Sequence, residues 1–157
     1  MVVSVNVLAG GVPKLPVRGA AITASGVEGD RQRNLRYHGG PDRAVCIFAA
    51  EVIERLRAEG HPIAPGTVGE NVTVRGLDWA RVVPGARLYV GSVLLEVTGY
   101  TAPCRTIAGS FADRRSSRIS QKTHPGASRV YARVLRPGRV AAGDAATLLA
   151  PTEPPAP

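Results

Sequence analysis

The apolar residues of this 157-residue chain fall mostly in short runs that alternate with polar positions. In one run, Val130, Ala132 and Val134 alternate with larger or charged residues. Valine, isoleucine and leucine dominate such runs, and glycine and proline separate them, as is typical of strands joined by turns. We expect strands at 2–8, 17–23, 44–48, 72–75, 87–90, 93–98, 129–135 and 145–149. Many short strands predict a mainly β fold, closed into a barrel.

One segment has the period of a helix instead. Between residues 49 and 59, Val52, Ile53 and Leu56 share one face, and Gly60 and a following proline end the pattern. We expect one clear helix here. The polar stretch 101–121 predicts only short helical turns.

The length predicts a single domain, residues 1–150, followed by a proline-rich tail at 151–157 that we expect to be disordered. Met1 is not followed by a basic leader, and no apolar run approaches the roughly 20 residues that span a bilayer. We therefore expect a cytoplasmic protein without a membrane partner.

The chain is strongly basic, with 18 arginines and 2 lysines against 12 acidic residues, a net charge of +8. Such a field attracts nucleic acid, a membrane surface or a small anion, or serves solubility alone. The arginines are scattered, aromatic residues make up 4%, and no run of five basic residues occurs. Nucleic acid is therefore disfavoured, and a small anionic ligand is the preferred partner.

The two cysteines predict different roles. They form no CxxC pair, so a four-ligand zinc site is poorly supported. Cys46 lies between apolar residues, which indicates a core position. Cys104 lies between Pro103 and Arg105, whose guanidinium favours the thiolate that attacks electrophiles and binds soft metals. An inert, half-buried thiol remains the alternative for Cys104.

A shaped turn precedes the third expected strand, at Tyr37–Arg43. Gly39 and Gly40 permit a close backbone approach to a ligand, and their amides can form a nest for an anion. His38 can donate to a phosphate or carry a proton, although it is equally explained as a loop residue bonded to backbone. Positive charge for an anion can come from Arg31, Arg43 and Arg133, each otherwise an ordinary solvated residue.

A second irregular stretch, Gly69-Glu70-Asn71, puts a carboxylate and an amide at a strand entrance. A carboxylate can accept two parallel hydrogen bonds from an amidine-like edge, such as that of a pterin. It can equally bond the local backbone as a turn residue.

Together these stretches resemble the MOSC domain, named for the C-terminal domain of molybdenum cofactor sulfurases. The resemblance extends in order from about residue 29 to residue 149 and is nearest to small stand-alone bacterial members. It rests on Gly29-Asp30, His38-Gly39-Gly40-Pro41-Asp42-Arg43-Ala44, Gly69-Glu70-Asn71, Pro103-Cys104, and Tyr131-Ala132-Arg133-Val134 followed by Pro137-Gly138 and Gly143-Asp144.

The resemblance implies a MOSC-type β-barrel that binds the molybdenum cofactor (molybdopterin), with a functional cysteine at Cys104. In some relatives this cysteine ligates molybdenum in oxidoreductases that reduce N-hydroxylated bases or amines. In sulfurases it is thought to carry sulfur as a persulfide, so the alternative is a sulfur carrier or non-catalytic cofactor-binding module. Molybdenum ion binding and pyridoxal phosphate binding are further expectations from the family.

On this reading Cys104 is the metal ligand and, with His38 and Asp30, a catalytic residue. The expected cofactor-binding residues are Arg31, His38, Gly39, Gly40, Arg43, Gly69, Glu70, Asn71 and Arg133. The expected partners are a small-molecule substrate and either an external electron donor or a molybdoenzyme.

Two features depart from the family pattern. Ser128-Arg129 stands where many relatives have Arg-Gly, so no family role is assigned to Arg129. No pyridoxal-phosphate-dependent cysteine desulfurase domain precedes the barrel, which disfavours a complete sulfurase.

Overall fold

A computed structural model describes residues 1–8, 11–30 and 40–151 of the chain. The described part contains one α-helix, α1 (Ala50–Ala58). Its 3-10 helices are η1 (Pro41–Arg43), η2 (Trp79–Arg81), η3 (Arg105–Ser110) and η4 (Ser116–Ile119). Its strands are β1 (Val2–Val7), β2 (Leu15–Val17), β3 (Gly19–Thr23), β4 (Gly26–Val27), β5 (Val45–Ala49), β6 (Val72–Val74), β7 (Arg87–Val90), β8 (Val93–Tyr100), β9 (Val130–Arg136), β10 (Gly138–Ala141) and β11 (Ala146–Leu148).

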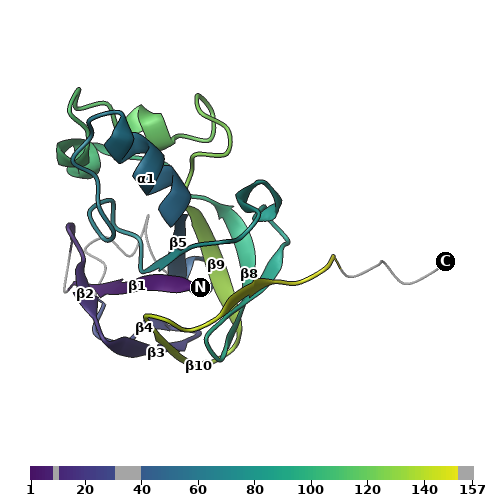
Figure 1. The fold of residues 1–157 in the computed structure, drawn as a ribbon. Helices are drawn as coiled ribbons and strands as arrows, with labels where there is room; N and C mark the ends of the chain where they lie inside the picture. Colours follow the sequence, from purple (N-terminus) through teal and green to yellow (C-terminus); the bar gives the residue numbers. More distant parts are fainter. Residues whose placement is uncertain (9–10, 31–39, 152–157) are drawn as a thin grey trace.

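The strands form two sheets (Figure 1). The larger has the order β11-β7-β8-β9-β5-β6-β1-β2, and the smaller has the order β10-β3-β4. Neighbouring strands are antiparallel except β5 and β6, whose parallel pairing requires the crossover that contains α1. The mainly β class is confirmed. The expected barrel closure is not seen among the described residues, because β2 and β11 stay at the two edges of the larger sheet and β10 pairs with β3.

The strand expected at 17–23 is divided. Val17 pairs with Val5 of β1 in the larger sheet, whereas Ala21 pairs with Arg139 of β10 in the smaller one. The change of partner falls at Arg18, so one continuous run of sequence feeds both sheets. β4 and β10 are two strands that the hydrophobic pattern did not predict.

Two hydrophobic clusters hold the described residues together. The first lies within the sheets and includes Val5, Leu95 and Val130. The second packs α1 against the segment that contains η3 and η4, both at the top of Figure 1, through apolar residues that include Leu56 and Phe111. The predicted helix is therefore confirmed. Its apolar face packs against Ile107 and Phe111, which anchors the otherwise polar stretch 101–121. No helix in the described residues combines the length and apolar character needed to cross a membrane.

Candidate functional site

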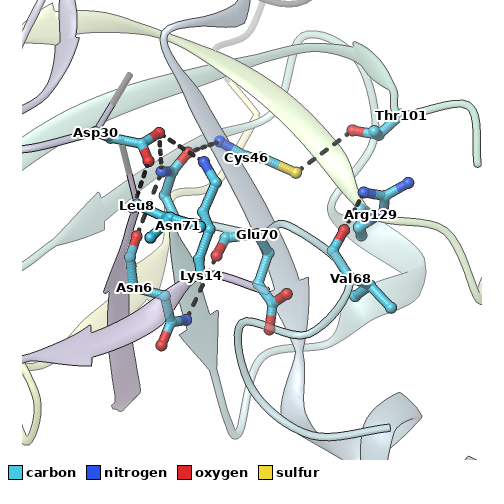
Figure 2. A network of polar contacts seen from close by, with 10 residues as sticks. All are labelled: Asn6, Leu8, Lys14, Asp30, Cys46, Val68, Glu70, Asn71, Thr101 and Arg129. Carbon is cyan, nitrogen blue, oxygen red and sulfur yellow. Dashed lines mark hydrogen bonds and ion pairs between the residues drawn. The ribbon is translucent and has the colours of Figure 1, made fainter. Parts of the chain in front are cut away.

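A buried polar network joins the Glu70-Asn71 stretch to residues far away in sequence (Figure 2). The Asp30 carboxylate accepts hydrogen bonds from Lys14 Nζ at 2.5 Å, Asn71 Nδ2 at 2.8 Å and the Leu8 amide at 3.0 Å. Asn71 Oδ1 accepts the Cys46 amide at 3.0 Å. The structure thus brings Asp30 and Asn71 together, and their side chains bind groups inside the protein.

Glu70 is fully buried. Its Oε1 accepts hydrogen bonds from the Gly66 amide at 2.7 Å and Thr73 Oγ1 at 2.9 Å. Its Oε2 has no hydrogen-bond partner among the described residues. Burial raises the pKa of the Glu70 carboxyl, since a charge is poorly solvated there, while these hydrogen bonds and the charge of Arg129 oppose the rise. The alternative that Glu70 bonds the local backbone as a turn residue explains the contact of Oε1 with Gly66. It does not explain why Oε2 is buried without a partner among the described residues.

Gly69 is required by its conformation and surroundings. Its φ is +86°, and a Cβ built on it would lie 2.9 Å from Val12 Cγ1 and 3.8 Å from Arg129 Nη1. The guanidinium of Arg129 lies beside this loop and is only 5% exposed. The family pattern gave Arg129 no role, and a lone arginine before a strand carries no other sequence signal. The structure places it next to the predicted site.

A thiol, a hydroxyl and a phenol gather where β5, β8 and β9 meet. Cys46 Sγ lies 3.6 Å from Thr101 Oγ1, and burial raises the pKa of the Cys46 thiol. Tyr131 pairs with Cys46 across β9 and β5, and burial, followed by the nearby Cys46, raises the pKa of Tyr131 to about 12. The Arg43 guanidinium lies 5.4 Å from the centre of the Tyr131 ring, within cation–π range. The predicted core position of Cys46 is confirmed.

The helix η1, which Gly40 precedes, lies against β9, the strand that carries Arg133. Gly40 has φ +85° and precedes η1, whose Asp42 carbonyl accepts a hydrogen bond from Thr98 Oγ1. Arg133 is about half exposed and forms ion pairs with Asp42 at 3.5 Å and Glu96 at 3.2 Å. Two carboxylates therefore offset part of its charge, although its exposure leaves it accessible to an anion.

Cys104 is a free, exposed cysteine directly before η3. Its Sγ lies 2.7 Å from Thr106 Oγ1. The described residues contain no group of three or more histidine, cysteine, aspartate or glutamate side chains arranged for a metal ion. Any metal bound at Cys104 by this part of the chain would therefore have fewer than three such side chains as ligands.

The structure brings the predicted residues together in three groups. Asp30 and Asn71 are hydrogen-bonded, and Arg43 contacts Tyr131 of β9, the strand that also carries Arg133. The Gly69 loop is linked by Arg129 to Ala102, two residues before Cys104. Three other predicted residues, Arg31, His38 and Gly39, lie outside the described residues. The meeting of all three groups at one ligand stays a prediction.

Comparison with known proteins identifies the family. The model of the MOSC domain matches residues 34–147. YflK, an uncharacterized protein of Bacillus subtilis (strain 168), is 33% identical over 135 residues, covering 85% of this chain and 60% of YflK. Protein YiiM of Escherichia coli (strain K12) is 29% identical over 136 residues, covering 83% of this chain and 60% of YiiM.

A solved structure supports the same relationship. The crystal structure of YiiM from Geobacillus stearothermophilus matches with a TM-score of 0.70 and 26% identity, covering 94% of this chain and 74% of that one. The chain spans 60% of the length of each of the two curated relatives above, so it corresponds to only part of those proteins. Because the family model covers well over half of the sequence, the chain belongs to the MOSC domain family.

Proposed function

We propose that this MOSC protein binds a molybdenum cofactor through Cys104 and reduces N-hydroxylated bases or amines. The observation that carries the proposal is the free, exposed thiol of Cys104, which is open to a ligand in a chain whose other cysteine is buried. A thiolate is a soft donor suited to a metal of this kind.

The other residues fit the cofactor in their chemistry. A pterin phosphate carries roughly −1.5 to −2 charge near neutral pH, by analogy with phosphorylated side chains. Arg43 and Arg133 are two cations at one strand, and Gly40 offers a close approach beside them. Held by Cys104, the cofactor would supply two-electron redox chemistry for removal of the substrate oxygen. A small-molecule substrate and an external electron donor complete the proposed reaction.

The buried residues Glu70, Asn71 and Asp30 would stabilise the loops of this site rather than contact the cofactor. The side chains of Glu70 and Asn71 are fully buried: the former accepts the Gly66 amide within the loop, and the latter binds the Cys46 amide and Asp30. The Asp30 carboxylate accepts hydrogen bonds from Asn71 and Lys14. Its proposed role in proton transfer therefore requires that these hydrogen bonds break. The proposed proton-carrying role of His38 concerns a residue outside the described part of the chain.

The same exposed thiol favours a second candidate, a sulfur carrier for another molybdoenzyme. Here Cys104 would hold a persulfide, because an accessible thiolate is also the form that exchanges sulfur. Pyridoxal phosphate binding and a cytoplasmic location stay expectations from the sequence.

The test compares the wild-type protein with Cys104→Ala and, as a matched control, Cys46→Ala, all purified from a host that makes the cofactor. Native mass spectrometry and elemental analysis would measure pterin, molybdenum and persulfide on each protein. We expect molybdenum in the wild type and in Cys46→Ala, and its loss from Cys104→Ala. The loaded wild type should then reduce an N-hydroxylated purine with an artificial electron donor.

Two other results would redirect the proposal. A persulfide at Cys104 without metal supports the sulfur carrier. Molybdenum that survives Cys104→Ala contradicts the ligand assignment, and cofactor-loaded protein that reduces none of several N-hydroxylated substrates contradicts the reductase.

A further inference from the structure

Arg129 occupies an unusual place for a cation. It directly precedes β9, and its side chain is 95% removed from solvent. The neighbouring Ser128 is also buried, and its carbonyl accepts a hydrogen bond from Trp79 Nε1 at 3.2 Å. The backbone that carries Arg129 is therefore fixed on both sides, by the strand and by this contact.

The guanidinium connects two separate loops (Figure 2 shows its contact with Val68). Its Nη1 donates to the carbonyl of Val68, and its Nη2 donates to the carbonyl of Ala102 at 3.4 Å. Neither carbonyl accepts a backbone amide among the described residues. The planar fork of an arginine can serve two such acceptors at once, so one side chain satisfies both loops.

The backbone of Arg129 adds a third link. Its carbonyl accepts the Thr101 amide at 2.9 Å, so main chain and side chain hold consecutive residues, Thr101 and Ala102. On the far side of Cys104, the Ile107 amide donates to the Cys104 carbonyl at 3.3 Å, and Ile107 is buried. The cysteine therefore lies on a short segment that is anchored at both ends.

The burial of this cation is expensive. No carboxylate lies within ion-pair distance of Arg129 among the described residues, and its Nε has no hydrogen-bond partner there. A buried guanidinium without a paired acid loses hydration that two carbonyls only partly replace. An apolar side chain would avoid this cost but would leave the Val68 and Ala102 carbonyls without the donors that Arg129 supplies, so the two loops explain the presence of an arginine here.

We propose that Arg129 is a positioning residue, which ties the Val68–Asn71 loop to residues 101–102 and thereby fixes the place of the Cys104 thiol. The importance of that thiol rests on the proposed function. The link itself does not, because it is a property of the metal-free chain.

The test uses the two cysteines of the protein. A nitroxide spin label reacts with exposed Cys104, while buried Cys46 stays protected and reports that the core is intact. In Arg129→Met, which keeps an unbranched apolar stem but removes the charge and the donors, we expect the rotational rate of the label to rise roughly twofold or more. Arg129→Lys keeps the charge but not the fork, so it should give an intermediate rate, and it replaces the first variant if that one does not fold.

The control separates positioning from general stability. Leu88→Ala removes a fully buried side chain from the first hydrophobic cluster and should destabilise the protein by about 2–5 kcal/mol. We expect it to leave the mobility of the Cys104 label unchanged under native conditions. A folded Arg129→Met protein, or Arg129→Lys in its place, with a wild-type label spectrum would overturn the proposal.

Hydrogen exchange tests the coupling between the loops. Amides at 66–71 and at 101–107 should both exchange roughly fivefold faster or more in Arg129→Met, with β7 and β8 unaffected. A change confined to one loop would contradict the coupling. Since both measurements use metal-free protein, a failure to find molybdenum on the wild type leaves their outcome intact, and the two proposals can fail separately.

Discussion

At the scale of single residues, Glu70 is a carboxylic acid enclosed in the core beside Thr73 of β6. One oxygen is hydrogen-bonded and the other has no partner among the described residues, a combination better satisfied by the neutral acid than by the anion. The raised pKa of Glu70 follows from that enclosure. Folding should therefore favour the protonated form.

We predict that Glu70→Gln removes a pH dependence of stability. Because the folded pKa of Glu70 lies above its ordinary 4.5, its contribution is complete below that value and is lost as the pH rises through the folded pKa. The free energy of unfolding of Glu70→Gln should therefore increase relative to that of the wild type as the pH rises, because only the wild type loses stability. Urea unfolding between about pH 4 and pH 8 measures this difference. Glu54→Gln, at an exposed position, is the control; a constant difference for Glu70→Gln would refute the prediction.

The glycine beside this acid is equally constrained. Gly66 has φ +83°, and a Cβ there would lie 2.2 Å from the Lys14 carbonyl oxygen, whereas Gly76 has φ +82° and nothing within 4 Å. We predict that Gly66→Ala costs roughly 3 kcal/mol or more, from backbone strain plus a clash with main chain. Gly76→Ala should cost about 1 kcal/mol from strain alone. Chemical denaturation of both variants decides, and equal losses would show that the contact with Lys14 relaxes at little cost.

At the scale of elements, the ion pair of Lys14 and Asp30 links the chain before β2 to the chain after β4. Both side chains are more than nine-tenths buried, and Asn71 brings the approach to β6 into the same group. Each buried charge is tolerated because the opposite charge lies within hydrogen-bond distance, with Lys14 Nζ 2.5 Å from Asp30 Oδ2. The two irregular connections consequently depend on each other.

We predict that Lys14→Met destabilises the protein by about 3–5 kcal/mol, since it leaves the Asp30 carboxylate buried without its cation. Lys14→Met combined with Asp30→Asn should recover part of that loss, because the remaining amide needs no counter-charge. Arg75→Met, which removes an exposed pair with Glu54, is the matched control and should cost no more than about 1 kcal/mol. A double-mutant cycle from urea unfolding measures the coupling, and additive losses would argue against it.

The elements that sequence predicted well are those whose pattern reflects a single environment. α1 and β7 came out at or near their expected bounds, because one face of each is buried in one cluster. The pattern at 17–23 did not predict that the segment divides into two strands, because the pairing partners in β1 and β10, not the local residues, decide where the chain changes sheets. β10 is short and begins at Gly138, so its pattern is too weak to detect.

The candidate site shows the same limit. Its residues were proposed from their chemistry, and the apolar neighbours of Cys46 correctly predicted that this cysteine is buried, whereas Cys104 is exposed. The burial of Glu70 and Arg129 could not be predicted, because polar residues enter a core only when distant segments supply their partners. Arg129 was set aside for lack of a family match, and only its contacts with Val68 and Ala102 reveal a role.

At the scale of the whole molecule, the two hydrophobic clusters meet around β5, which continues into α1. Ala44, Val45 and Ile47 belong to the first cluster, and Phe48 and Ala49 belong to the second. Cys46 lies between these residues in the strand, and its buried thiol contacts Thr101 just after β8. Exposure of Cys46 should therefore require disruption of the fold as a whole.

We predict that the native protein contains one fast-reacting thiol and one that reacts only through unfolding. Cys104 is exposed and should react at once, whereas Cys46 is buried and its raised pKa further disfavours the reactive thiolate. Mass spectrometry after alkylation with iodoacetamide should show one label per chain at first and two only in denaturant. Cys104→Ser should lose the fast label and Cys46→Ser should keep it.

When unfolding and refolding are fast compared with alkylation, the rate at which Cys46 is labelled should fall about tenfold for each 1.4 kcal/mol of added stability. This rate is then set by the free energy of unfolding. Two fast labels on folded wild type would instead mean that β5 opens locally, and the two clusters would then not form one cooperative unit.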